Sequence, residues 1–273
     1  MLIAVHQMNS TFDIHQNVMA MMAGIKEAKA GGATAYFAPE MSLLLDRDRV
    51  RARSVITTEA NSTALSEIAQ AASQAGIWVH IGSFPVISER AADRFCNRTM
   101  VFDSSGQIQA RYDKMHLFDV DLATGESWRE SAAYLGGDGP VMTASPLGPM
   151  GLTICYDLRF PELFCTLARS GAVAFAVPAA FTVPTGAAHW HVLLRARAIE
   201  SAAFVIAAAQ SGKHADGRET YGHSLVVDPW GDVLLDMGEG EGLGFVDLDL
   251  ERIEAVRAQI PVHLNRRDIP PLR

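Results

Sequence analysis

The chain has 273 residues, of which 49% are hydrophobic and 20% charged, so it is long and apolar enough to bury one large core. Lysine and arginine number 23 against 31 aspartate and glutamate residues, and the net charge of −8 argues against nucleic acid or an anionic membrane as a partner. No apolar run approaches the roughly 18 residues of a membrane span, and the N-terminus reads as a strand rather than as a secretory signal.

The first half of the chain alternates strand and helix patterns. Residues 2–8 read as a buried strand, residues 12–30 as a helix with an apolar stripe that Gly31 and Gly32 end, and residues 36–38 as a short strand. After a polar loop we expect a helix over 62–75, and then strands over 78–84, 99–103 and 107–112, the last two joined by a turn at 103–106. These strands fit one mixed sheet.

The second half repeats this style. Its expected elements are a strand over 151–155, a helix over 161–170, a strand over 172–177, a loop over 178–186, a helix over 189–203, strands over 204–209, 224–227, 233–235 and 244–248, and a helix over 250–258. Two sheets that face each other, with helices outside, would bury such a chain. No linker is evident, so we expect a single domain over 1–273.

Three reactive side chains follow three of the expected strands. Glu40 comes after the strand ending at Ala38, Lys114 ends an alternating stretch, and Cys155 lies where a strand gives way to a helix. Alone, Cys155 is equally well explained as a buried strand residue, and Glu40 and Lys114 are each better explained as solvated surface charges. Together they supply a nucleophile, a general base and a cationic stabiliser for acyl transfer through a thioester. Backbone N–H groups after Cys155 would lower the pKa of its thiol and hold an oxyanion.

The sequence around these residues resembles the nitrilase superfamily of carbon–nitrogen hydrolases. The resembling segments are Ala38-Pro39-Glu40, Tyr112-Asp113-Lys114-Met115-His116-Leu117-Phe118 and Ile154-Cys155-Tyr156-Asp157-Leu158-Arg159-Phe160-Pro161-Glu162. The resemblance extends from Ile3 to Pro261 in the expected order. It implies a four-layer αββα sandwich, with Glu40 as general base, Lys114 as oxyanion-stabilising cation and Cys155 as nucleophile. Many members carry a second glutamate after the lysine, and Glu130 matches its place, with Glu126 as the competitor.

The expected pocket wall follows from the same strand ends. The loop over 178–186 follows a strand that ends on the side of Cys155, so Phe181, Thr182 and Thr185 are expected to line the pocket beside Tyr156. Arg159, four residues after the nucleophile, is a candidate to bind a substrate carboxylate bidentately, and a structural salt bridge to Glu162 is the alternative.

The segments after Ala179 look most like the deaminated glutathione amidase branch of the superfamily. This resemblance implies a cysteine-dependent amidase that hydrolyses a small carboxylate-bearing ω-amide through a thioester and releases ammonia or an amine. The alternatives are an ω-amidase acting on α-ketoglutaramate, an N-carbamoyl amino acid hydrolase and an aliphatic nitrilase. A non-catalytic scaffold is disfavoured because all three reactive residues are present.

The remaining expectations concern location, cofactors and assembly. Cys96, Cys155 and Cys165 form no even disulfide framework, which fits a reducing, cytoplasmic compartment. His189 and His191 resemble a metal pair, but residues two apart on a helix point to different faces, so we expect no metal and no cofactor. Apolar residues on more than one face of the helices over 161–170 and 189–203, and a proline-rich tail over 260–273, predict a homodimer with the tail at the interface.

Overall fold

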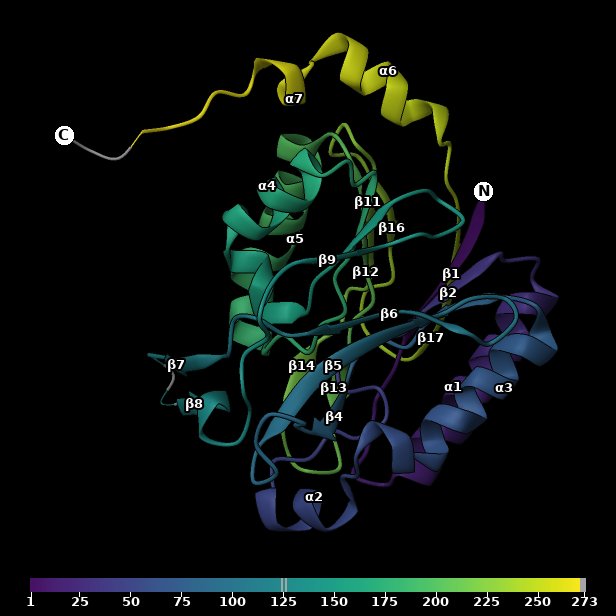
Figure 1. Ribbon diagram of the computed structural model, residues 1–273, viewed down its shortest axis with the longest axis vertical. Helices are drawn as coiled ribbons and strands as arrows, with labels where there is room; N and C mark the ends of the chain where they lie inside the picture. The colour runs from purple at the N-terminus through teal and green to yellow at the C-terminus, as the bar shows by residue number, and fades with distance from the viewer. Residues whose placement is uncertain (124, 126, 271–273) are drawn as a thin grey trace.

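The computed structural model describes residues 1–123, 125 and 127–270, which form two β-sheets packed face to face with helices on both outer sides (Figure 1). The first sheet has the order β17 (Gly242–Asp247), β1 (Leu2–Gln7), β2 (Ala35–Phe37), β3 (Trp78–His80), β5 (Phe95–Phe102) and β4 (Phe84–Ile87), and β6 (Ile108–Asp113) also pairs with β5. The second has the order β16 (Val233–Asp236), β15 (Leu225–Val227), β12 (Phe204–Ala207), β11 (Ala174–Ala176), β10 (Met150–Leu152) and β9 (Val141–Thr143).

Helices cover the outer face of each sheet. The first sheet carries α1 (Ile14–Ala30) and α3 (Thr63–Ala75), and the second carries α4 (Pro161–Arg169) and α5 (Val183–Ser201). The smaller elements are α2 (Arg49–Val55), α6 (Glu251–Gln259), α7 (Val262–Asn265), the two-stranded pairs β7 (Asp119–Asp121) with β8 (Ser127–Arg129) and β13 (Ser211–Lys213) with β14 (Glu219–Tyr221), and 3₁₀ turns at Glu59–Asn61, Glu130–Ala132 and Cys155–Arg159. The expected four-layer αββα sandwich is therefore confirmed.

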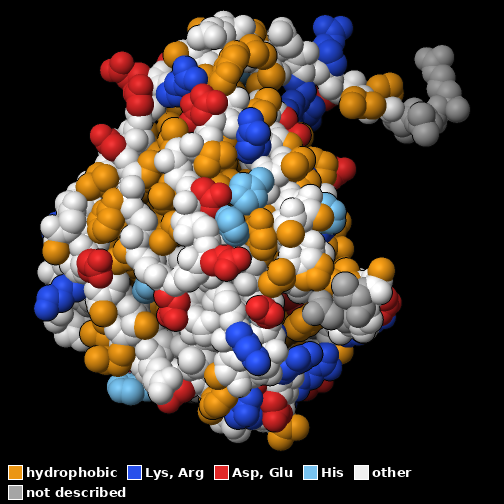
Figure 2. All heavy atoms as spheres, turned by 180° about the vertical axis from the view of Figure 1, so that it is seen from behind, with side chains coloured by type: hydrophobic (Ala, Val, Ile, Leu, Met, Phe, Trp, Pro, Cys, Tyr) orange, Lys and Arg blue, Asp and Glu red, His pale blue; other side chains and the backbone are white. Residues whose placement is uncertain are grey.

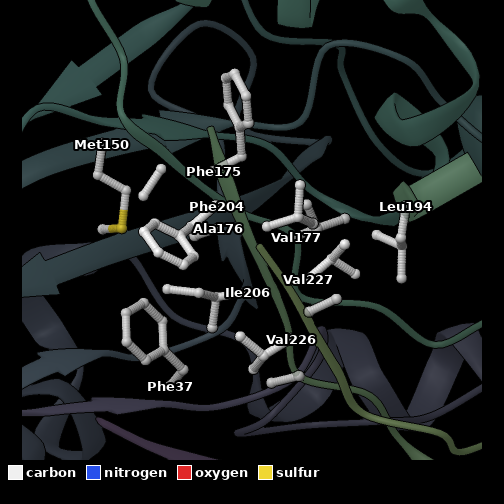
Figure 3. Close-up of a cluster of buried hydrophobic side chains, with 14 of the residues drawn as sticks. Phe37, Met150, Phe175, Ala176, Val177, Leu194, Phe204, Ile206, Val226 and Val227 are labelled. Carbon is white, nitrogen blue, oxygen red and sulfur yellow. The ribbon is translucent and has the colours of Figure 1, made fainter. Parts of the chain in front are cut away.

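Strand alternation explains how one sheet serves two cores. On β1, Ile3 and Val5 belong to the apolar cluster between the two sheets, whereas Ala4 belongs to the cluster under α1 and α3. The inner cluster is drawn in Figure 3, where Phe37 of the first sheet lies near Ile206 and Val226 of the second. The first sheet is mixed as predicted, because β1, β2 and β3 are parallel and the other strands antiparallel.

The sequence prediction placed several boundaries wrongly. Helix α5 begins at Val183, six residues before the predicted start, because Pro184 falls in its first turn, where no backbone N–H is needed. Helix α2 lies in the stretch read as a polar loop, because its Arg-rich sequence has only Ala52 buried and so no apolar stripe. The predicted strand over 78–84 is divided into β3 and β4, with Gly82 between them at a φ of 77°.

The C-terminal segment runs along one end of the molecule. Helix α7 interrupts the tail that the sequence indicated as non-helical, and the described residues after it extend away from the body (Figure 2). Residues 271–273 of the predicted tail lie outside the described residues. Within the described part of the chain, no helix has the length and apolar character that crossing a bilayer requires.

Candidate active site

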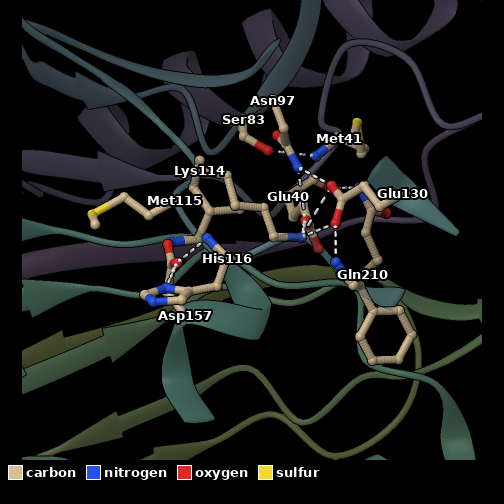
Figure 4. Close-up of polar contacts among 12 residues, drawn as sticks. Glu40, Met41, Ser83, Asn97, Lys114, Met115, His116, Glu130, Asp157 and Gln210 are labelled. Carbon is tan, nitrogen blue, oxygen red and sulfur yellow. Dashed lines mark hydrogen bonds and ion pairs between the residues drawn. The ribbon is translucent and has the colours of Figure 1, made fainter. Parts of the chain in front are cut away.

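Glu40, Lys114 and Cys155 meet at one end of the sandwich, where strands of both sheets finish. Glu40 follows β2 and Lys114 follows β6 of the first sheet, and Cys155 follows β10 of the second. The Lys114 ammonium lies 2.9 Å from Glu40 Oε1 and 2.9 Å from Glu130 Oε2 (Figure 4). All four residues line one cavity of about 280 Å³. These residues are far apart in the sequence, and the fold brings them together at the strand ends, as expected.

The backbone at Cys155 is held in an unusual conformation. Its φ is 48°, a left-handed value that costs a non-glycine residue free energy, and its N–H donates to the Pro178 carbonyl at 2.9 Å. The five-residue 3₁₀ turn that starts at Cys155 leads into α4. This sharp strand-to-helix turn presents the Cys155 side chain to the cavity at the end of the sheet, as a nucleophile requires.

Burial raises the pKa of the Cys155 thiol well above its ordinary value, and the nearby Glu40 carboxylate adds to this effect. Lys114 and a backbone hydrogen bond to Ala180 act in the opposite direction but do not prevail. The pKa of the thiol is therefore raised overall, against the expectation that backbone N–H groups would lower it. A thiol that stays protonated needs a base at hand, and Glu40 is the carboxylate beside it.

Lys114 keeps its charge although it is buried. Burial alone would lower the pKa of its ammonium, but the carboxylates of Glu130 and Glu40 outweigh burial and raise that pKa well above the usual value. The side chain is only 2% exposed. The result is a fixed cation beside the thiol, suited to stabilise a developing oxyanion.

Glu130 is fixed by contacts that continue beyond Lys114. Its Oε2 accepts a 2.7 Å hydrogen bond from the Phe118 N–H, and its Oε1 lies 3.4 Å from Asn97 Nδ2. The competing residue Glu126 lies outside the described residues. The structure therefore places Glu130 beside Lys114, where the sequence comparison expected a second glutamate.

Sequence reasoning missed two amides that hold Glu40. Asn97 donates from Nδ2 to Glu40 Oε1 at 2.9 Å, and Gln210 donates from Nε2 to the Glu40 carbonyl at 2.9 Å. Both amide side chains are fully buried, and their N–H groups donate inside the protein, whereas Asn97 Oδ1 has no partner among the described residues. Asn97 lies in β5, which is buried along its whole length. A polar residue in such a buried strand was the only feature of the sequence that could have indicated a role for Asn97.

The predicted wall residues divide into two groups. Tyr156, Phe181, Thr182 and Thr185 line the cavity with Cys155, and the hydroxyls of Thr182 and Thr185 are 2.8 Å apart. Arg159 is not among the lining residues. Its guanidinium carbon lies 5.9 Å from the Tyr156 ring centroid and 5.6 Å from that of Phe181, and its Nη2 is 3.3 Å from His189 Nδ1. The structure thus places Arg159 against two wall residues rather than in the wall itself.

One group of potential metal ligands exists among the described residues. Asp236 lies 2.9 Å from His191 Nε2 and 2.9 Å from His223 Nδ1, and the three candidate ligand atoms lie within 4.8 Å of one another. None of the three lines the cavity around Cys155. His189 points instead toward Arg159, which agrees with the prediction that His189 and His191 face different sides of their helix.

Comparisons with known proteins show the family of this chain. The family model described as carbon–nitrogen hydrolase matches residues 2–258. The deaminated glutathione amidase of Bos taurus is 40% identical over 274 residues, covering 97% of this chain and 82% of that protein. The crystal structure of the C. elegans NitFhit protein has a TM-score of 0.90 and 34% identity, covering 97% of this chain, which spans 65% of that longer one. A mutant amidase from Nesterenkonia sp. AN1, whose active-site cysteine carries acrylamide by Michael addition, has a TM-score of 0.79 at 26% identity.

Proposed function

The chain belongs to the carbon–nitrogen hydrolase family, and from this premise we propose that it is an amidase in which Cys155 is the nucleophile, Glu40 the general base, Lys114 the oxyanion-stabilising cation and Glu130 a second catalytic carboxylate. It hydrolyses carbon–nitrogen bonds other than peptide bonds. The observation that carries the residue assignment is the buried Lys114 ammonium, held 2.9 Å from each of two carboxylates in the cavity that Cys155 lines.

The first half of the reaction forms a thioester. Glu40 accepts the Cys155 thiol proton as sulfur attacks the amide carbonyl, so the carbonyl electron pair moves to oxygen beside Lys114 and the Tyr156 N–H. When the oxyanion collapses, the carbon–nitrogen bond breaks and Glu40 returns the proton to the leaving nitrogen. Ammonia or an amine leaves, and the acyl group remains on sulfur.

The second half regenerates the enzyme. Glu40 accepts a proton from water as the water oxygen attacks the thioester carbonyl, and Lys114 again balances the oxyanion. Collapse breaks the carbon–sulfur bond, the carboxylic acid leaves, and the sulfur regains its proton from Glu40. Glu130 holds the Lys114 ammonium in place throughout, because its own position is fixed by the Phe118 N–H.

The substrate we propose is a small amide with a carboxylate end, of the deaminated glutathione type. A cavity of about 280 Å³ suits a small molecule, and curated relatives from several organisms carry the name deaminated glutathione amidase at about 40% identity. We also propose that the whole chain acts as one domain, as a homodimer in the cytoplasm, without cofactor. The exposed apolar side chains of Val192 and Ile199 on α5 favour the dimer.

An activity panel tests this function. We expect release of ammonia or amine from deaminated glutathione, slower release from α-ketoglutaramate, and little from an N-carbamoyl amino acid or an aliphatic nitrile. A preference for α-ketoglutaramate would instead identify an ω-amidase. A folded wild-type protein that hydrolyses none of these compounds would contradict the proposal.

A further inference from the structure

The cavity beside Cys155 has a second polar corner that the reaction does not use. Two guanidinium groups there lie against one indole, with the guanidinium carbon of Arg47 5.5 Å and that of Arg218 5.3 Å from the Trp128 ring centroid. All three residues line the cavity together with Cys155. A guanidinium packed on an aromatic ring keeps its N–H edge free to bind, so this packing orients two cations without using their donors.

Asp216 anchors both arginines. Its fully buried carboxylate accepts a 2.8 Å hydrogen bond from the Arg47 backbone N–H and another of 2.8 Å from Arg218 Nε. Its other oxygen accepts the Arg218 backbone N–H at 3.0 Å. The acid is therefore used mainly to fix the two chain segments, and it binds only one edge of the Arg218 guanidinium. The terminal nitrogens of Arg218 remain available.

The corner has spare hydrogen-bond donors. Among the described residues, the Arg47 guanidinium and the terminal nitrogens of Arg218 have no acceptor, and the buried indole Nε1 of Trp128 has none. Of the four acids in the lining, Glu40 and Glu130 bind Lys114 and Asp46 binds Arg51, whereas Glu219 has no ion-pair partner among the described residues. Charged donors that no acceptor among the described residues uses favour a ligand that brings a planar anion.

We propose that Arg47 and Arg218, oriented by Trp128, bind a carboxylate of the amide substrate and so select acidic amides over neutral ones. This inference rests on the proposed amidase function and adds the residues that determine its specificity. It assigns the carboxylate to other residues than the sequence prediction did, since Arg159 lies against Tyr156 and Phe181 and outside the lining. A guanidinium pair suits a carboxylate because each can donate two parallel N–H bonds to it.

The kinetic test compares a matched pair of substrates, glutaramate and the neutral pentanamide, by ammonia release. For Arg47→Gln we expect KM for glutaramate to rise about 10-fold with kcat little changed, and for Arg47→Gln with Arg218→Gln a larger rise. The kcat/KM for pentanamide should stay within about 2-fold of the wild-type value in both variants. Arg47→Lys should restore only part of the selectivity, because an ammonium cannot form the bidentate pair. Arg169→Gln, which removes one exposed charge on α4 outside the cavity, is the matched control.

A binding measurement separates this inference from the proposed function. Calorimetric titration of glutarate into the Cys155→Ala protein needs no turnover, and we expect the affinity to fall about 10-fold on adding Arg47→Gln. If the wild type is inactive but the expected fall in glutarate affinity is found, only the amidase proposal is overturned. Equal losses on glutaramate and pentanamide, unchanged glutarate affinity in the double variant, or loss of selectivity in Arg159→Gln instead, would each overturn the Arg47 and Arg218 assignment.

Discussion

The Tyr112 hydroxyl donates a 2.7 Å hydrogen bond to the Asp157 carboxylate, and this bond joins the strand end that carries Lys114 to the turn that carries Cys155. Asp157 is fully buried and also accepts from the backbone N–H of His116 at 3.1 Å and of Ile154 at 2.8 Å. Residues 112–118 and 154–162 are thus joined into one hydrogen-bonded unit. The unit sets the distance between the cation and the nucleophile.

Asp157→Asn should therefore impair catalysis without touching substrate. The amide would present an N–H to groups that are themselves donors, leaving at least one of them unpaired at a cost of about 2 kcal/mol in the free energy of unfolding. We expect kcat to fall more than 10-fold with KM little changed, because the Cys155 turn moves relative to Lys114. Tyr112→Phe removes the bond to Asp157 and the 3.2 Å bond that the Met115 N–H donates to the hydroxyl, and it should show the same pattern more weakly. Urea unfolding and steady-state kinetics measure both effects, and a normal kcat in Asp157→Asn would refute the positioning role.

Replacing Cys155 with alanine should abolish turnover and leave the fold intact, since the change removes one sulfur atom from a small buried side chain. Intact-mass spectrometry of the wild type with a slow substrate should show an acyl adduct, and peptide mapping should place it on Cys155. Cys96 is buried in the core of the first sheet and serves as an internal control. An adduct on Cys96 or Cys165 would exclude the assignment.

Lys114→Met should lower kcat by about 100-fold or more, the usual effect of losing one oxyanion donor. The substitution also leaves Glu40 and Glu130 without their shared cation, so part of the effect will appear as lower stability. Glu130→Gln separates the two contributions, because it keeps Lys114 and its bond to Glu40. We expect Glu130→Gln to lose less activity than Lys114→Met; near-wild-type kcat in a folded Lys114→Met protein would make Lys114 a structural residue.

The sequence predicted those elements and site residues whose signal lies in the neighbouring residues, and it missed those that depend on contacts between distant segments. Glu40, Lys114 and Cys155 were identifiable because each ends a strand within a distinctive segment, and the layers followed from alternating patterns. Asn97 was not, since a strand residue reveals its contact with Glu40 only when distant strands pair. The corner at Trp128 was missed for the same reason: Arg47 and Arg218 are 171 positions apart in the sequence, and only the fold brings both to Trp128 and Asp216. Long-range polar contacts leave no periodicity to detect.

Acid should destabilise the fold partly through His6. Burial lowers the pKa of its imidazole from the ordinary 6.5 to about 4, so the folded state holds it neutral while the unfolded chain binds a proton below pH 6.5. The contribution of neutral His6 is complete above pH 6.5 and is lost as the pH falls toward 4, by about 2 kcal/mol at pH 4.5. His6→Gln should reduce the difference in the free energy of unfolding between pH 7 and pH 4.5 by that amount, whereas His15→Gln, at an exposed site on α1, should not. Identical pH dependence in His6→Gln and the wild type would contradict this account.

A homodimer should form through α5 and the tail. Val192 and Ile199 on α5 are 68% and 49% exposed, and Leu264 on α7 is 76% exposed. Arg266 Nη2 donates to the Glu200 carbonyl at 3.2 Å, which holds the tail beside the end of α5, so these apolar side chains belong to adjacent elements that one partner surface can cover.

Sedimentation at micromolar concentration should give about twice the 29.5 kDa chain mass. Val192→Asp should place two like charges near a two-fold axis and produce monomer, and deletion after Ile260 should weaken the dimer. Val50→Asp, at an 83% exposed apolar residue on α2, is the matched control and should remain dimeric. A wild-type monomer with full activity would contradict the dimer and leave the catalytic assignment standing, because every residue assigned to the reaction lies in one chain.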